Sequence, residues 1–296
     1  MSSSTGWRTI VIDKKTELSY STGTLLVEED DGTSRNIPLF DVRSIIVRSL
    51  QVKMTAYLLN ELHKRKISVI FCNEKSSPYG EIVGYYNHHA APARLFEQIR
   101  WKKEVRRQVW TQIVRQKITV QCLLLGTLHH AEAQEKLEPH AVNVAVGDKT
   151  NREGQAARLY FHALFGIDFR RQRGDSPINS PLNYGYAILC SMVTRALTAH
   201  GYHPSLGIAH RGATNPFNLS YDLMEPFRPF VDRIVCRNGA APLEKEYKNQ
   251  LIGVSGDIVR YKNRQMPLAT AVDAWILDIT KVLSGRSGTI GEIRFK

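Results

Sequence analysis

The stretch GIAHRGATNPFNLSYDLMEPFRP, residues 207–229, joins a polar loop to a helical pattern that two prolines interrupt. The pattern consists of apolar residues on one stripe, namely Leu219, Leu223 and Phe227. Pro226 and Pro229 fall within it, and each proline removes a backbone donor and crowds the carbonyl group four residues earlier. The stretch therefore predicts a helix that breaks near Glu225, with some backbone strain at the break.

Two acids of this stretch, Asp222 and Glu225, are three residues apart, so a helix would place them on one face. Two carboxylates on one face are costly unless a cation lies between or near them. One interpretation is structural: Glu225 caps a helix that starts at Pro226, or pairs with Arg228. The other is functional: the break turns the Glu225 carboxylate and a freed carbonyl group toward a cleft. The residues alone leave both open.

A third acid, Glu153, lies in the segment NREGQAARLYF, residues 151–161, at the start of an expected helix. The helix dipole favours a carboxylate there, so a capping role is the alternative to a functional one.

His210 lies in the loop part of the opening stretch, near the carboxylate pair. Carboxylate oxygens suit Mg²⁺ or Mn²⁺, and an imidazole nitrogen favours Mn²⁺ or another transition ion. One octahedral ion held by few protein groups would leave positions for phosphate oxygens and could polarise a phosphodiester.

The charge balance indicates a polyanionic partner. The 296 residues include 40 Lys and Arg against 28 Asp and Glu, a formal net charge of +12. Nucleic acid is the first candidate and an anionic membrane the second. Four arginines lie within a few residues of the acids and the histidine, and they are candidates for DNA contacts: Arg152, Arg158, Arg211 and Arg228.

Several classes of protein are disfavoured by the sequence. No segment approaches the roughly 18 apolar residues of a membrane span, and the N-terminus lacks the pattern of a signal peptide, so we expect a cytoplasmic protein without a membrane partner. No C-x-x-C occurs, and the cysteines are expected to be buried free thiols: Cys72, Cys122, Cys190 and Cys236. No P-loop, G-x-G-x-x-G or Ser-His-Asp order appears.

The pattern along the chain predicts an α+β protein with a small N-terminal β-rich domain (residues 1–76), a linker (77–92) and a larger all-α domain (93–296). Strands are expected at Trp7–Asp13, Glu17–Ser21, Thr24–Glu28, Arg35–Leu39, Arg43–Val47 and Ile67–Cys72, with a helix at Met54–Lys66. Helices are expected at Ala93–Gly126 (one or two), Gly154–Phe165, Pro181–His200, Leu243–Ile252 and Leu268–Leu283.

Several motifs together resemble one known family, the CRISPR-associated protein one family, which integrates new spacers. They are NREGQAAR (residues 151–158), the loop GIAHRGATNP around His210 (207–216, the histidine loop), DLMEPFRP (222–229) and LNYGYAIL (182–189). The resemblance extends from Trp7 to about Val282, and the opening GWRTIVID is similar to members from type II systems.

The resemblance implies a site and an activity. The family's metal ligands fall on Glu153, His210 and Glu225, which would be the catalytic residues around one Mg²⁺ or Mn²⁺, with Asp222 as a supporting acid. The implied activity is a DNA integrase that joins prespacer 3′-hydroxyl ends to the repeat by transesterification. The alternatives are a structure-specific DNA endonuclease that uses the same site, and a non-catalytic DNA-binding scaffold.

The resemblance also implies partners. These are double-stranded DNA (prespacer and repeat array), a second copy of this chain in a homodimer, and CRISPR-associated protein two. Members from type II systems act in addition with the effector nuclease and, in some cases, with a DNA-end-binding accessory protein.

Overall fold

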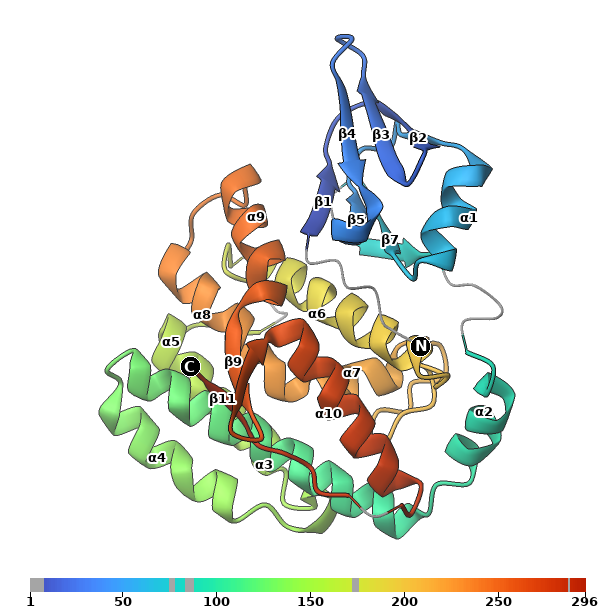
Figure 1. Ribbon diagram of the computed structural model, residues 1–296. Helices are drawn as coiled ribbons and strands as arrows, with labels where there is room; N and C mark the ends of the chain where they lie inside the picture. Colours follow the sequence, from blue (N-terminus) through green and yellow to red (C-terminus); the bar gives the residue numbers. More distant parts are fainter. Residues whose placement is uncertain (1–7, 75–77, 83–87, 172–175, 287) are drawn as a thin grey trace. The chain divides into compact units, whose positions relative to one another are not determined.

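The computed structural model describes residues 8–74, 78–82, 88–171, 176–286 and 288–296. The chain divides into two compact units, Met1–Tyr86 and Asn87–Lys296 (Figure 1). Strands dominate the first unit and helices the second, so the α+β class is confirmed. The division falls inside the segment 77–92 that we expected to be a linker, and this segment contributes a strand, β8 (Pro78–Glu81), to the first unit.

The first unit contains two four-stranded sheets. The strands of one sheet are, in spatial order, β1 (Arg8–Ile12), β5 (Val42–Val47), β7 (Ser68–Cys72) and β8. The strands of the other are β4 (Ser34–Pro38), β3 (Thr24–Glu29), β2 (Thr16–Ser21) and β6 (Lys53–Met54). In the first sheet β1, β5 and β7 are parallel, while β2, β3 and β4 form an antiparallel meander in the second.

Apolar side chains of both sheets share one core with the helix α1 (Ala56–Lys64). Leu18, Ile45 and Leu58 are fully buried there. The hydroxyl group of Thr55 accepts a hydrogen bond from the backbone amide of Leu58 (3.1 Å), which caps the start of α1. The positions of these elements agree with the strands and the helix expected from the sequence.

The second unit is built on nine helices among the described residues. They are α2 (Ala91–Ile99), α3 (Lys103–Thr127), α4 (Ala131–Val142), α5 (Arg152–Phe165), α6 (Asn179–Ala199), α7 (Asn218–Met224), α8 (Arg228–Asn238), α9 (Lys245–Gly253) and α10 (Leu268–Leu283). The long helix α3 contacts α4, α5, α8 and α10, and α6 contacts α7, α8, α9 and α10 (Figure 1). Trp275, Tyr160 and Phe230 are fully buried between these helices.

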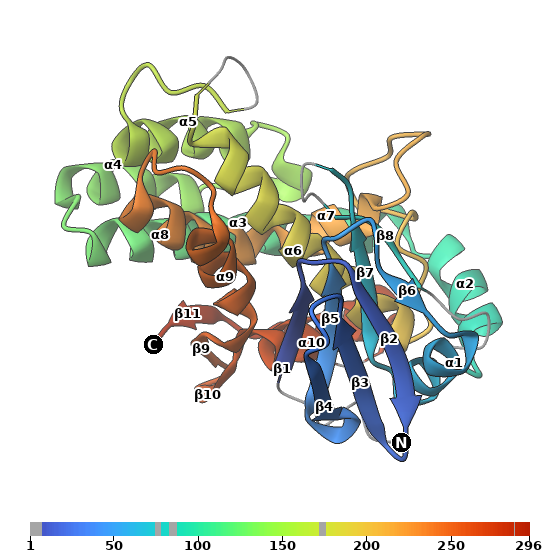
Figure 2. The ribbon, with the colours of Figure 1, turned by 90° about the horizontal axis from the view of Figure 1, so that it is seen from above.

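A three-stranded antiparallel sheet interrupts the helical pattern of the second unit, and the sequence did not predict it. Its strands are β10 (Arg264–Pro267), β9 (Ile258–Tyr261) and β11 (Ile293–Phe295), and Figure 2 shows them together near the C-terminus. The strands have only three or four residues, too few for an alternating pattern to be recognised. The domain expected to be all-α therefore also contains strands.

The break in the helix near Glu225 is confirmed. The helix α7 ends at Met224, a 3₁₀ turn η3 spans Glu225–Phe227, and α8 begins at Arg228. Pro226 and Pro229 each lie at the start of a new helical segment, where a missing amide hydrogen costs little. The expectation of strain was therefore wrong. The expected free carbonyl group is also not found at Glu225, because its oxygen accepts the amide hydrogen of Arg228.

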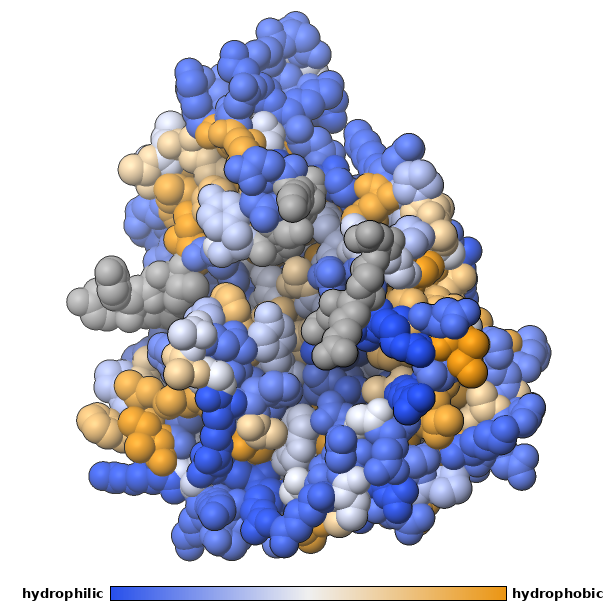
Figure 3. All heavy atoms as spheres, turned by 180° about the vertical axis from the view of Figure 1, so that it is seen from behind, coloured by the Kyte–Doolittle hydropathy of each residue, from blue (hydrophilic) through white to orange (hydrophobic). Residues whose placement is uncertain are grey.

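The surface shown in Figure 3 is mostly hydrophilic, with apolar residues in separate patches. None of the described helices has both the length and the apolar composition of a bilayer-crossing segment. Cys72, Cys122 and Cys190 are buried, as expected, whereas Cys236 is only partly buried.

Candidate active site

Every residue singled out for chemistry lies in the second unit, on four separate segments. Glu153 is in the first turn of α5, Glu225 begins η3, Asp222 is near the end of α7, and His210 lies in the loop between α6 and α7. His210, Asp222 and Glu225 are near one another in the sequence, whereas Glu153 is distant from them, so only the tertiary fold can bring α5 to the other segments.

Two other residues cap the start of α5. The side chain of Asn151 accepts a hydrogen bond from the amide of Gly154 (3.2 Å). The Asp148 carboxylate accepts hydrogen bonds from the amides of Arg152 (2.7 Å) and Glu153 (3.1 Å). The carboxylate of Glu153 instead contacts Lys117 on α3, with 2.7 Å between Nζ and Oε1. The interpretation of Glu153 as a capping acid is therefore wrong.

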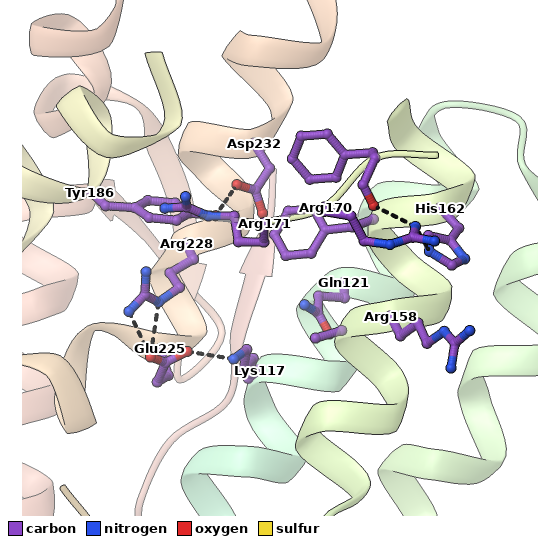
Figure 4. Close-up of a pocket in the computed structure, with 13 residues that line it drawn as sticks. Lys117, Gln121, Arg158, His162, Arg170, Arg171, Tyr186, Glu225, Arg228 and Asp232 are labelled. Atoms are coloured by element: carbon purple, nitrogen blue, oxygen red, sulfur yellow. Dashed lines mark hydrogen bonds and ion pairs between the residues drawn. The ribbon is translucent and has the colours of Figure 1, made fainter. Parts of the chain in front are cut away.

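Lys117 lies between the two glutamates. Its Nζ atom is 2.7 Å from Glu153 Oε1 and 2.6 Å from Glu225 Oε2. The other oxygen of Glu225 accepts a hydrogen bond from Arg228 Nε (2.9 Å) and forms an ion pair with Arg228 Nη2 (2.8 Å), so the pairing of these two residues is confirmed (Figure 4). The cluster holds two carboxylates and two cations, and its formal charges cancel.

Burial and charge act in opposite directions on this cluster. Burial alone would raise the pKa of Glu225, but the charges of Arg228 and Lys117 outweigh it and lower the pKa well below its ordinary value. Burial alone would lower the pKa of Lys117, but the charges of Glu225 and Glu153 raise it. Glu225 and Lys117 are therefore both ionised at neutral pH.

Asp222 holds the histidine loop in place. Its fully buried carboxylate accepts hydrogen bonds from the amides of Ile208 (2.5 Å), Ala209 (3.0 Å) and His210 (3.1 Å). The same carboxylate is 2.6 Å from His210 Nδ1. Its hydrogen bond to the ring raises the pKa of His210 against the opposing effect of burial. With Nδ1–H donated to Asp222, the neutral ring carries its lone pair on Nε2.

The chemistry of three of these groups, two carboxylates and an imidazole, is compatible with a divalent ion. A single cationic atom already lies within 2.7 Å of both Glu153 and Glu225. The buried Oε2 atom of Glu225 contacts Lys117 but accepts no well-directed hydrogen bond, so it keeps its capacity for another cation. A metal-binding histidine commonly donates a hydrogen bond from its second ring nitrogen to a carboxylate, and His210 Nδ1 is paired with Asp222 in this way.

No three His, Cys, Asp or Glu side chains in the described part of the chain are arranged to hold an ion together. Lys117 lies where an ion would bridge the two glutamates. The set of Glu153, His210 and Glu225 as ligands of one ion therefore stays a prediction.

A pocket of about 660 Å³ opens beside this cluster, and Lys117 and Glu225 form part of its wall (Figure 4). Cationic and aromatic side chains dominate the rest of the lining, among them Arg158, Arg170, Arg171, Arg228, Phe161 and Tyr186. The ring of Tyr186 lies 4.4 Å from Cζ of Arg228 and 5.1 Å from Cζ of Arg171. Guanidinium groups bind phosphates and aromatic rings stack on bases, so the lining suits a nucleic acid.

Of the four arginines proposed for DNA contacts, Arg158 and Arg228 line the pocket, whereas Arg152 and Arg211 do not. Arg152 donates to the side chain of Gln155 (3.2 Å), and Arg211 is exposed on the histidine loop. Arg170 and Arg171 also line the pocket and were not predicted, although the basic run FRRQR around them is visible in the sequence.

Asp232 on α8 supports one wall of the pocket. It is buried and accepts hydrogen bonds from the hydroxyl groups of Tyr160 (2.8 Å) and Tyr186 (2.5 Å). Burial outweighs these bonds and raises the pKa of Asp232 from 3.8 to about 6. The native state thus binds this proton more tightly than the unfolded chain, so the contribution of Asp232 to stability is lost as the pH rises from about 4 to about 6.

Replacing Asp232 with asparagine should therefore change how stability depends on pH. A difference of about two pKa units corresponds to about 3 kcal/mol. We expect the free energy of unfolding of D232N, relative to the unchanged protein, to rise by about this amount between pH 4 and pH 7. Urea unfolding of both proteins at the two pH values measures it. A difference that is independent of pH would contradict the assignment.

Comparison with known sequences identifies the family. The model of the family "CRISPR associated protein Cas1" matches residues 9–242. A CRISPR-associated endonuclease Cas1 from Neisseria meningitidis serogroup C is 38% identical over 229 residues, which cover 77% of this chain and 75% of that protein. A CRISPR-associated endonuclease Cas1 from Pyrobaculum aerophilum is 30% identical over 244 residues, which cover 77% of this chain and 80% of that one.

Solved structures share the fold at lower sequence identity. A casposase bound to integration product matches with a TM-score of 0.78 and 16% identity, over 96% of this chain and 92% of that one. A Cas1 protein from Thermotoga maritima matches with a TM-score of 0.73 and 17% identity, over 95% and 98% of the two chains. Since the family model matches most of the chain and the Neisseria protein is 38% identical to it, the chain belongs to the CRISPR-associated protein Cas1 family.

Proposed function

We propose that this protein joins DNA strands as the integrase of CRISPR spacer acquisition. The observation that carries the proposal is that Glu153 and the buried Glu225 share one cation, Lys117, and that Lys117 and Glu225 lie at the wall of a basic and aromatic pocket. Membership of the Cas1 family supports it, as does the likeness in fold to a casposase described as bound to integration product.

The reaction is a transesterification. A prespacer 3′-hydroxyl oxygen attacks a phosphorus atom of the repeat in line, a new P–O bond forms, and the old P–O bond breaks to release a 3′-hydroxyl group. A Mg²⁺ or Mn²⁺ ion, when bound, would polarise the phosphodiester and stabilise the charge on the phosphate and the leaving oxygen.

The residues of the site have separate roles in this reaction. Glu153, Glu225 and His210 would hold the ion, and Asp222 positions the imidazole ring through Nδ1. Arg228 fixes the Glu225 carboxylate through two contacts to Oε1 and leaves Oε2 toward Lys117. Arg158, Arg170 and Arg171 at the pocket wall would neutralise DNA phosphates.

A second candidate uses the same site for hydrolysis. With water in place of the 3′-hydroxyl group, the protein would be a structure-specific endonuclease, and the Cas1 relatives from Neisseria and Pyrobaculum carry the name endonuclease. The third alternative is a scaffold that binds DNA and catalyses neither reaction.

The partners of the proposed integrase follow from its reaction and its relatives. Double-stranded DNA supplies both the prespacer and the repeat array. The likeness to a chain of a Cas6-RT-Cas1–Cas2 complex (TM-score 0.74, 19% identity, 97% of this chain and 36% of that one) supports a small Cas2 partner. A homodimer of this chain, the effector nuclease of a type II system and a DNA-end-binding accessory protein complete the proposed assembly.

Strand joining on a branched DNA with a free 3′-hydroxyl group separates the candidate functions. We expect labelled product in Mg²⁺ or Mn²⁺ and none in EDTA, because the reaction needs the ion to stabilise the charge on phosphate. The readout is a denaturing gel that resolves longer, joined strands from shorter, hydrolysed ones. Hydrolysis without joining would favour the endonuclease, and neither reaction with intact binding would favour the scaffold.

A further inference from the structure

Lys117 is a buried cation in the middle of α3, and its side chain is only 10% exposed. Its ammonium group contacts one oxygen of Glu153 and one of Glu225, at 2.7 and 2.6 Å. These acids are two of the three ligands in the proposed function, on which the following inference rests.

The two acids differ in how much they depend on Lys117. Glu225 has a second cationic partner, since its other oxygen contacts Arg228 at 2.8 Å. Among the ion pairs of the described residues, Glu153 is paired with Lys117 alone. Without Lys117, two acids would face each other with the single charge of Arg228 to balance them, which is unfavourable at a buried site.

An ammonium group and a metal ion cannot both occupy this position. A Mg²⁺ ion lies about 2.1 Å from its carboxylate oxygens. The ammonium nitrogen already lies between the same two oxygens at hydrogen-bond distance. An ion bound between Glu153 Oε1 and Glu225 Oε2 must therefore displace Lys117 from them.

We propose that Lys117 is an internal counter-ion that competes with the divalent ion for the Glu153–Glu225 pair. In the protein without metal it holds the two carboxylates together and balances their charge. It thereby preserves the arrangement of the site and lowers its affinity for metal. When the ion enters, the ammonium group moves into the pocket, whose wall it already lines beside Arg228.

The test is direct Mn²⁺ binding, followed by electron paramagnetic resonance of free Mn²⁺, in the absence of DNA. Lys117→Met removes the charge and keeps an unbranched side chain. We expect K117M to bind Mn²⁺ at least about tenfold more tightly than the unchanged protein, because a competing positive charge is gone. The control K136M removes an exposed lysine that pairs with Glu132 on α4, and it should leave the affinity unchanged.

Thermal unfolding gives a second readout. In EDTA the midpoint of K117M should lie below that of the unchanged protein, and saturating Mn²⁺ should raise it more in the variant than in the unchanged protein. A lysine with a merely structural role would lower the midpoint without changing Mn²⁺ affinity. If K117M does not fold, K117Q, which keeps a hydrogen-bond donor toward the acids, serves in its place.

The outcomes separate this inference from the proposed function. If the unchanged protein binds Mn²⁺, E225Q abolishes binding and K117M binds no more tightly, then the competition is wrong and the metal site stands. If E225Q binds Mn²⁺ as tightly as the unchanged protein, then the metal site itself is wrong, and the competition is wrong with it.

Discussion

Glu225→Gln should lower the rate of strand joining by about a thousandfold while leaving DNA affinity nearly unchanged. The loss of a ligand removes several kcal/mol of charge stabilisation in the transition state, and each 1.4 kcal/mol is about tenfold in rate. DNA affinity should persist because phosphate contacts come from arginine and lysine side chains. Single-turnover joining and a binding titration, on the same protein preparation, measure the two effects.

E225Q also leaves Lys117 and Arg228 with one acid fewer at a buried site, so lost activity alone could reflect lost stability. Such an unbalanced charge costs about 3–5 kcal/mol. The double variant K117M/E225Q restores the charge balance and serves as the control. It should regain much of the stability and none of the joining. Recovery of joining in the double variant would contradict the assignment of Glu225 as a ligand.

Gly207→Ala should lower strand joining by about a hundredfold with little loss of folded structure. A Cβ atom at this position would lie 2.2 Å from the backbone oxygen of His210 and 3.0 Å from Asp222 Oδ2. The loop must move to admit it, and this movement disturbs the hydrogen bonds that hold the imidazole ring. Groups that position a metal ligand are typically worth about 10–100-fold in metal affinity or activity.

The control for G207A is Gly256→Ala, because a Cβ atom there meets no heavy atom within 4 Å. Both variants add one methyl group to a glycine of the second unit, and only the first should affect joining. Far-ultraviolet circular dichroism and the unfolding midpoint should show that both variants fold. Unchanged joining by G207A would mean that the position of His210 does not matter for the reaction.

Much of the fold could be predicted because most of its elements have local signals. The β-rich first unit alternates strands with short turns, and the expected strands coincide with β1 to β5 and β7 to within one or two residues. The helix expected at Leu268–Leu283 has those bounds in α10. The helix α4 was missed because it is polar and contains Pro139, and Leu137 is its buried residue. Its stability comes from packing against α3 and α5.

The site was predictable only in part, because it depends on tertiary contacts as well as on local patterns. Their local context made Glu153, His210 and Glu225 candidates, and the family resemblance made them one ligand set, whereas the break at Glu225 could be predicted from its prolines. The burial of Lys117 at the site could not be predicted, since a lysine in a long basic helix is ordinarily exposed. Its role depends on α3, α5 and η3 meeting in space, which no local pattern encodes.

The central claim is that Glu153, His210 and Glu225 converge on one divalent ion. Anomalous diffraction from crystals grown with Mn²⁺ tests it most directly, because the ion is located independently of any activity. We expect one peak within bonding distance of both glutamates and of His210 Nε2, with the Lys117 ammonium group displaced. A peak elsewhere, or no peak with Lys117 still between the glutamates at saturating Mn²⁺, would contradict the claim.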